Sequence, residues 1–187
     1  MSFTPTSQVF KIRKSSNDSK LFLVRPAGSS KHAPPLYSIA FKSKKPNLLV
    51  YRGHTNLQNP VGYATFHTFS STIDMSLGGH HIPLKESTFA TKHSFQVPNM
   101  GRFQWKYSLL SGSHQLYDAS GQKIAKLSSV TLSLRGERKL ELMVQCNGFF
   151  MDLVVMSAMA TEHASGKAAE ASEASAEVVS AVVGITT

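Results

Sequence analysis

Residues 147–161 read NGFFMDLVVMSAMAT, and this stretch decides the fold. It shows no alternation of polar and apolar residues, it has no polar face, and it begins at Asn147, a residue type that often caps helices. As a helix, residues 148–161 would cover about 21 Å, which is shorter than the ~30 Å hydrocarbon core of a bilayer, and Asp152 interrupts the apolar run. The stretch therefore predicts a helix that protein surrounds on every side.

The sequence before this helix follows a period of two, which is typical of half-buried strands. In RFQWKYSL, residues 102–109, the side chains of Phe103, Trp105, Tyr107 and Leu109 share one face. The Gly78-Gly79 pair predicts a tight hairpin turn. Similar patterns predict strands at 9–14, 21–25, 36–42, 47–52, 61–68, 72–77, 81–86, 89–97, 114–118, 122–127, 130–134 and 140–146.

About a dozen short antiparallel strands favour a sandwich or a closed barrel, and a closed sheet of about twelve strands is wide enough to hold a helix. We therefore predict a mainly β fold, a closed antiparallel barrel of about twelve strands around a buried C-terminal hydrophobic helix. Residues 8–163 would form this barrel domain, after a flexible N-terminus at 1–7. Residues 164–187 are rich in Ala, Ser, Glu and Val, which predicts a low-complexity, flexible tail.

Basic residues dominate the part of the chain that is expected to fold. Nineteen of the 20 basic residues but only 8 of the 11 acidic residues precede Ala164, which gives this part a net charge of +11. Such a surface attracts lipid headgroups, nucleic acid or acidic proteins. The single cysteine, Cys146, excludes an internal disulfide and is expected to be an inert core thiol. With no signal peptide or transmembrane segment in view, we expect an intracellular, cytoplasmic protein that associates peripherally with a membrane.

The sequence offers little chemistry, so we expect no enzyme, no metal site and no cofactor. His80 and His81 are adjacent, and on a regular strand they would point to opposite faces. His93 lies on an apolar face, where a hydrogen-bonded core histidine is the better interpretation. Asp152 is the one anomalous charge, because it interrupts the buried helix. It is expected to pair with an inward Lys, Arg, Tyr or backbone N–H rather than to act in catalysis.

The order of these elements resembles the tubby C-terminal-like superfamily, which groups tubby-like proteins, phospholipid scramblases and LURP-one-related proteins of plants. The resemblance is greatest to small fungal members and covers residues 8–163. It rests on the aromatic strand RFQWKY at 102–107, the LYD and GQKIA segments at 116–118 and 121–125, and the hydrophobic helix at 149–160. It implies a twelve-stranded barrel around that helix. The chain has no acidic Ca²⁺ loop and no cysteine cluster, which argues against scramblase activity.

Five basic residues are the candidate ligand-binding residues, namely Lys11, Arg13, Lys42, Lys44 and Lys45. Such clusters suit the phosphates of an anionic phospholipid or phosphoinositide, although a solvated strand edge protected by lysines is the favoured explanation of the residues taken alone. The resemblance to tubby-like proteins favours a non-enzymatic module that binds anionic lipid. The alternative is a soluble protein-interaction or regulatory barrel with a protein partner. Nucleic acid is disfavoured because no exposed aromatic platform accompanies the basic residues. The sequence does not indicate an oligomeric state.

Overall fold

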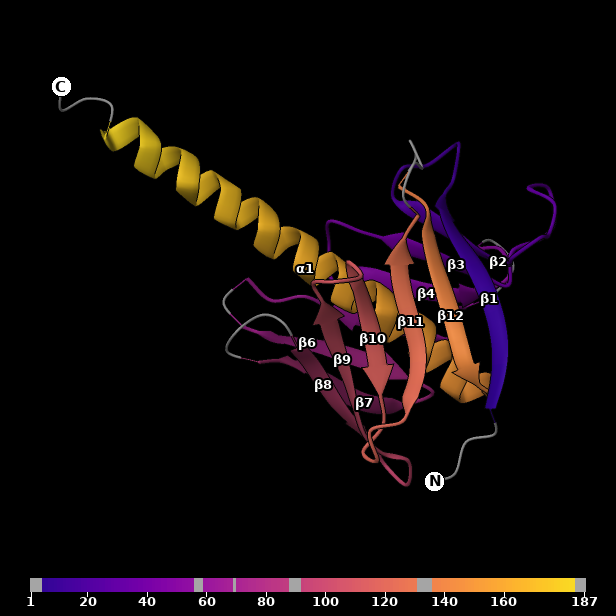
Figure 1. The fold of residues 1–187 in the computed structure, drawn as a ribbon. Helices are drawn as coiled ribbons and strands as arrows, with labels where there is room; N and C mark the ends of the chain where they lie inside the picture. The colour runs from indigo at the N-terminus through magenta and orange to yellow at the C-terminus, as the bar shows by residue number, and fades with distance from the viewer. Residues whose placement is uncertain (1–4, 56–58, 69, 88–91, 131–135, 184–187) are drawn as a thin grey trace.

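The structure is a computed structural model that describes residues 5–55, 59–68, 70–87, 92–130 and 136–183, with side chains from residue 7 to residue 166 within these ranges. Twelve strands precede one helix, α1 (Gly148–Val183) (Figure 1). The strands are β1 (Pro5–Lys14), β2 (Leu21–Pro26), β3 (Tyr37–Phe41), β4 (Leu48–Arg52), β5 (Gly62–Thr65), β6 (Thr72–Leu77), β7 (His80–Glu86), β8 (Lys92–Val97), β9 (Gly101–Ser108), β10 (Ser113–Tyr117), β11 (Lys123–Ser129) and β12 (Arg138–Val144).

The strands form one closed antiparallel barrel, which confirms the predicted fold class. Each strand pairs with its neighbours in sequence, and β1 closes the sheet against β12. β1 begins at Pro5, inside the segment expected to be flexible, because this end of the strand pairs with Val144 of β12. The Gly78-Gly79 turn is also confirmed, since both glycines have positive φ and connect Leu77 to His80. Of the strand expected at 130–134, only Val130 lies among the described residues.

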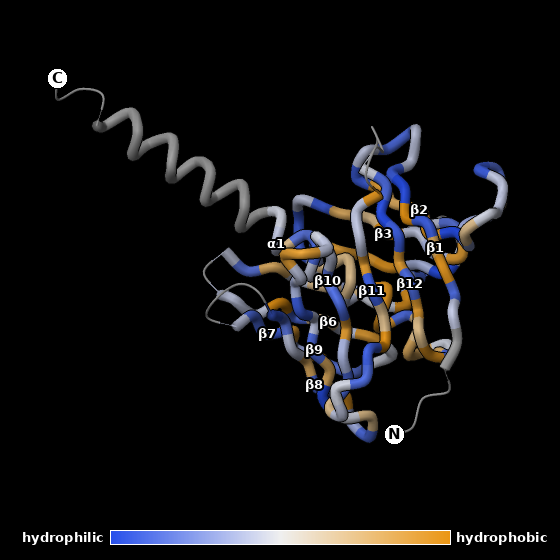
Figure 2. Tube along the Cα trace, viewed as in Figure 1, coloured by the Kyte–Doolittle hydropathy of each residue, from blue (hydrophilic) through white to orange (hydrophobic). Residues whose placement is uncertain are grey.

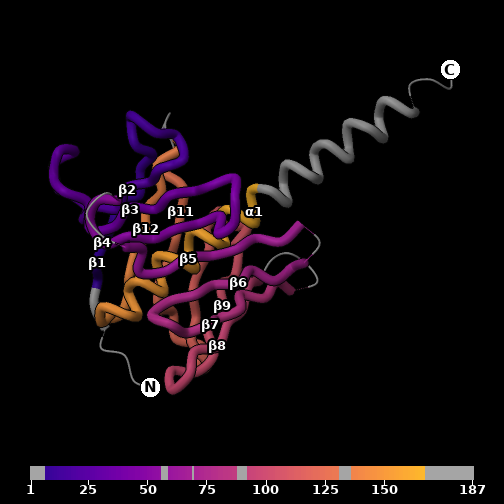
Figure 3. Tube along the Cα trace, turned by 180° about the vertical axis from the view of Figure 1, so that it is seen from behind, coloured from indigo at the N-terminus to yellow at the C-terminus, as the bar shows by residue number. Residues whose placement is uncertain are grey.

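The helix runs through the middle of this barrel. Views from opposite sides show strands in front of it and behind it (Figures 1 and 3). Residues 152–161 are all buried, as expected of a helix without a polar face, and hydrophobic residues recur along the strands that enclose it (Figure 2). α1 begins at the expected residue and continues past residue 161 to Val183. The expectation of a flexible tail at 164–187 stays a prediction.

Polar contacts hold the start of the helix inside the barrel. The backbone N–H of Phe150 donates to Asn147 Oδ1 at 2.8 Å, which confirms the cap. Arg52 donates to both carboxylate oxygens of Asp152, at 3.0 and 2.6 Å, and the Tyr37 hydroxyl donates to Asp152 Oδ1 at 2.8 Å. Burial, followed by this hydrogen bond, raises the pKa of Tyr37. The expected structural role of Asp152 is thus confirmed, since a guanidinium and a phenol satisfy the buried carboxylate.

Two further contacts fix the helix against the strands. Trp105 Nε1 donates to Ser157 Oγ at 3.0 Å, so a polar group in the middle of the helix is satisfied by a buried strand residue. On the other side, α1 approaches β5 at Gly62. A Cβ at Gly62 would lie 2.9 Å from Leu77 Cδ1 and 3.0 Å from Met156 Sδ. Only glycine leaves room for this contact.

The alternation on β9 extends less far than predicted. Phe103 and Trp105 are fully buried, but Tyr107 is exposed and Leu109 is 86% exposed. The expectation of one continuous apolar face was therefore wrong for these two residues. The physical reason is that β9 ends at Ser108, so that Leu109 falls in the turn, beyond the enclosed part of the barrel. Val130 differs in the same way, because it follows the end of β11 and is exposed.

His93 is buried as expected, but its Nε2 has no hydrogen-bond partner in the described part of the chain. Its nearest charged partner is Glu86, with Oε1 at 4.0 Å from Nε2. Burial, and to a lesser degree the nearby His114, lowers the pKa of His93 to about 4. The expectation of a core histidine is thus confirmed, whereas the expected hydrogen bond is not made at Nε2.

Replacing Val155 by Asp is expected to abolish soluble, cooperatively folded protein, because Val155 is fully buried and the new carboxylate would have no partner. The matched control, Val130→Asp, changes an exposed valine in the same way and should leave the melting temperature nearly unchanged. Circular dichroism and thermal melting measure both effects. A soluble Val155→Asp variant that melts like the wild type would contradict enclosure of the helix.

His93 predicts a loss of stability in acid. Unfolded histidine titrates near pH ~6.5, so below that pH the unfolded chain binds a proton that folded His93 does not bind until about pH 4. The free energy of unfolding should therefore fall between pH 7 and pH 4, with roughly 3 kcal/mol of the fall due to His93. Urea unfolding at several pH values gives the free energy of unfolding as a function of pH. This free energy should depend less steeply on pH in His93→Gln, whereas the exposed-site control His80→Gln should keep the wild-type pH dependence. Parallel curves for wild type and His93→Gln would contradict this account.

Candidate functional site

The outer face of β1 and β2 carries a group of cations. Phe10 and Ile12 point into the core, so the alternate residues Lys11 and Arg13 point outward, as predicted. On β2 the same alternation buries Val24 and turns Arg25 outward. The antiparallel register places Lys11 opposite Arg25, and thereby brings together residues from two strands.

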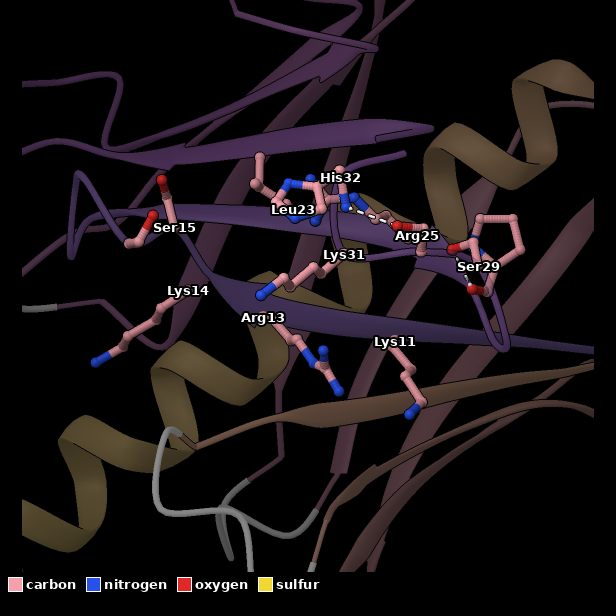
Figure 4. Close-up of a pocket in the computed structure, with 12 residues that line it drawn as sticks. Lys11, Arg13, Lys14, Ser15, Leu23, Arg25, Ser29, Lys31 and His32 are labelled. Carbon is pink, nitrogen blue, oxygen red and sulfur yellow. Dashed lines mark hydrogen bonds between the residues drawn. The ribbon is translucent and has the colours of Figure 1, made fainter. Parts of the chain in front are cut away.

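These side chains line a pocket of about 350 Å³ on the barrel wall. The segment that follows β2 forms its other side and contributes Lys31 and His32. Figure 4 shows Lys11, Arg13, Lys14 and Lys31 extending over the same side of the two strands. Five of the lining residues are cationic, and the full set is Lys11, Arg13, Lys14, Ser15, Ser16, Leu23, Arg25, Pro26, Ser29, Ser30, Lys31 and His32. We call this cavity the basic pocket.

The arrangement sets like charges directly opposite one another. Lys11 faces Arg25 across the β1–β2 ladder and Lys139 across the β1–β12 ladder. Like charges at directly opposed positions of a sheet destabilise it. A bound anion would reduce this repulsion, so the placement of the cations favours anion binding.

One carboxylate partly balances the charge. Glu137 is buried and contacts both Arg13 Nε and Lys11 Nζ, the latter at 3.6 Å. Arg25 is used structurally, because its Nε donates to the backbone carbonyl of Ala33 at 2.7 Å and so ties the segment after β2 to the barrel. Lys14 and Lys31 complete the cationic lining without an ion pair to a carboxylate among the contacts described. The pocket therefore keeps a net positive charge.

The other three candidate ligand-binding residues lie away from the basic pocket. Lys42, Lys44 and Lys45 are in the exposed turn between β3 and β4. Lys45 lines a second pocket, of about 520 Å³, together with His67, Glu86 and His93, and its Nζ lies 3.5 Å from His67 Nδ1. Lys11 and Arg13 thus share one cavity, whereas the three lysines of the β3–β4 turn do not line it.

Sequence reasoning missed Lys14, Arg25 and Lys31 as members of the site. Arg25 lies near the end of β2 and Lys31 lies in the segment between β2 and β3. The sequence did offer a local indication of an anion-binding segment. Residues 25–32 contain Arg, Lys and His together with Ala, Gly and two Ser, which is a composition typical of an exposed basic loop. Its relation to Lys11 and Arg13, however, depends on the register of two strands.

Other sequence expectations concern residues outside the basic pocket. His80 and His81 are exposed at the start of β7, and no described group of three or more His, Cys, Asp or Glu side chains is arranged to hold a metal ion. Cys146 is half-buried rather than in the core, and burial raises the pKa of its thiol to about 11, which makes the thiolate scarce at neutral pH. Within the described ranges, no helix has the length and apolar character needed to cross a membrane.

Comparisons with known proteins place the chain in a family of unknown function. No curated protein sequence matches the chain. An X-ray structure of a protein from Arabidopsis thaliana is similar to the chain with 13% identity and a TM-score of 0.38, covering 86% of this chain and 94% of that one. The sequence profile of a family of unknown function, DUF6593, matches residues 25–166, which include the last two residues of β2, all later strands and the enclosed part of α1. The chain therefore belongs to the DUF6593 family.

Proposed function

We propose that this chain is a non-enzymatic binding module whose basic pocket holds the phosphorylated headgroup of an anionic phospholipid, in particular a phosphoinositide. The observation that carries the proposal is the convergence of five cationic side chains on one cavity of about 350 Å³. A volume of this size suits a small, highly charged group, and it lies at the lower end of the range for ligand pockets.

The donor groups of the pocket match phosphate chemistry. Lysine and arginine bind phosphate oxygens through charge-assisted hydrogen bonds, and serine hydroxyls add neutral donors. Four serines, including Ser15 and Ser29, line the cavity beside the cations. The combination of several separated cations with hydroxyls favours a ligand that carries more than one phosphate group on a polyol.

The lining also supports binding rather than turnover. The nearby carboxylate of Glu137 already contacts Lys11 and Arg13, so it is engaged in ion pairs. The lining groups are cations, serine hydroxyls, the His32 imidazole and apolar side chains, and the cations and hydroxyls are suited to bind and orient an anion. The sequence's resemblance to tubby-like proteins also favours a lipid ligand over a protein partner.

Neutralising the pocket should weaken headgroup binding. For the triple variant Lys11→Gln, Arg13→Gln and Lys31→Gln, we expect affinity for a soluble inositol trisphosphate and for phosphatidylinositol bisphosphate vesicles to fall roughly 100-fold, since each cation near an anionic surface contributes about 1 kcal/mol. Calorimetry measures the soluble ligand and vesicle sedimentation measures the lipid. Binding should also weaken as salt rises above ~0.1 M.

The matched control removes the same charge elsewhere on the barrel, by Lys85→Gln, Arg102→Gln and Lys106→Gln, which are exposed residues of β7 and β9. It should keep the affinity for inositol trisphosphate within a few-fold of wild type. Equal losses in both triple variants would reduce the effect to non-specific charge attraction and contradict a specific pocket. Absence of any binding to inositol trisphosphate at low salt would overturn the headgroup site itself.

A further inference from the structure

Exposed apolar side chains gather at one hairpin of the barrel. In the turn between β9 and β10, Leu109 is 86% exposed and Leu110 is fully exposed. Tyr107 on β9 and Val130 after β11 are also exposed. These are four of the six exposed large hydrophobic residues in the described part of the chain. Single exposed apolar residues are ordinary, but a group of this kind marks a surface that meets an apolar partner.

The topology fixes where this hairpin lies. In an antiparallel barrel whose strands pair in sequence order, successive turns alternate between the two ends. The β9–β10 turn lies at the end where α1 leaves the barrel, as Glu162 of α1 shows by contacting Arg138 at 2.6 Å and His114 at 3.6 Å. Figure 1 shows this turn beside the helix. We call this end the exit end. The turns β1–β2 and β3–β4 lie there too, by the same alternation.

The exit end carries exposed lysines in addition to the apolar side chains of the β9–β10 turn. The β1–β2 and β3–β4 turns and their borders carry five exposed lysines, against one exposed carboxylate, Asp18. Glu137 and Glu162 lie at the same end, but both are engaged by basic residues. The lysines are Lys14, Lys20, Lys42, Lys44 and Lys45.

We propose that the exit end of the barrel docks on an anionic membrane, with Leu109 and Leu110 inserted at the boundary between headgroups and acyl chains and the lysines of the two turns on the headgroups. This inference rests on the proposed function, because it takes a lipid surface as the source of the headgroup, and it adds the orientation. Insertion of apolar side chains together with several basic residues is what makes peripheral binding strong, since each contribution alone is weak.

The shape of the site favours a bilayer over a protein partner. The two leucines project from a four-residue turn and line none of the pockets described for this structure, so a fluid apolar phase can surround them more readily than a rigid protein surface can. The five lysines are spread over separate turns, as suits a broad anionic surface. Lys14, Ser15 and Ser16 also line the basic pocket, so a membrane at the exit end reaches one border of that pocket.

The test replaces both leucines, as Leu109→Ser with Leu110→Ser. Affinity for vesicles of phosphatidylcholine, phosphatidylserine and a little phosphatidylinositol bisphosphate should fall at least about tenfold, because two apolar side chains no longer leave water. The melting temperature and the affinity for soluble inositol trisphosphate should stay unchanged. The matched control, Leu36→Ser, alters an exposed leucine in the β2–β3 connection at the opposite end and should bind vesicles like the wild type.

A second measurement reports insertion directly. Leu110→Trp keeps the tip apolar, and its fluorescence should be quenched by brominated lipid, whereas the buried Trp105 of the wild type should not respond. Wild-type vesicle affinity of the double serine variant, or no quenching in Leu110→Trp, would overturn the docking surface. Concentration-dependent self-association that the serine variant loses would overturn it in favour of a second copy of the chain.

The two proposals fail in distinguishable ways. If inositol trisphosphate does not bind but the serine variant still loses vesicle affinity, the headgroup pocket is wrong and the docking surface stands. If inositol trisphosphate binds but the serine variant behaves as wild type, the docking surface is wrong and the pocket stands. Loss of inositol trisphosphate binding in the serine variant would show that the leucines act on the fold, and would overturn insertion.

Discussion

The requirement that α1 stay out of water governs this structure. Its residues 152–161 are buried on every side, and in this chain the closed sheet covers the helix all round. The few polar groups on the helix are acceptable inside the barrel because strands supply their partners. Asp152 has Arg52 and Tyr37, and Ser157 has Trp105. Helix and barrel therefore depend on each other, since neither can bury its apolar face alone.

This constraint directs any binding to the outside of the barrel. Barrels of other proteins hold ligands in their interior, but here the helix occupies that space and contacts β4, β5 and β6 closely. At Gly62 even a methyl group would collide with neighbouring atoms. The two cavities described above are lined instead by loops and by strand residues that carry polar and charged side chains.

Charge on that outer surface is placed at the expense of stability. The alignment of Arg25, Lys11 and Lys139 across three strands is unfavourable in itself, and ion pairs of Lys11 with Glu137 and of Lys139 with Glu141 offset part of the repulsion. The two leucines at the β9–β10 turn are exposed at a similar disadvantage. Sites that break local rules for a soluble surface are where function is to be sought. The opposed cations and the two exposed leucines both lie on the outside of the barrel, because the helix fills its interior.

The sequence by itself determined the elements and the fold class. Asn147 and the apolar run after it predicted the start and the enclosure of the helix, Gly78-Gly79 predicted a hairpin, and period-two alternation predicted which side chains share a face on strands such as β9. These features are local, because neighbouring residues fix backbone geometry and which side chains share a face. Only the tertiary structure decided which cations meet.

The pairing of Arg13 with Glu137 joins residues 124 positions apart, and Lys11 meets Arg25 through the register of β1 on β2. Tertiary structure also decided where alternation stops. Tyr107 and Leu109 continue the apolar pattern of Phe103 and Trp105 but lie beyond the covered part of the barrel. The pattern in the sequence records which face a residue takes, whereas burial depends on how far the neighbouring strands and the helix extend.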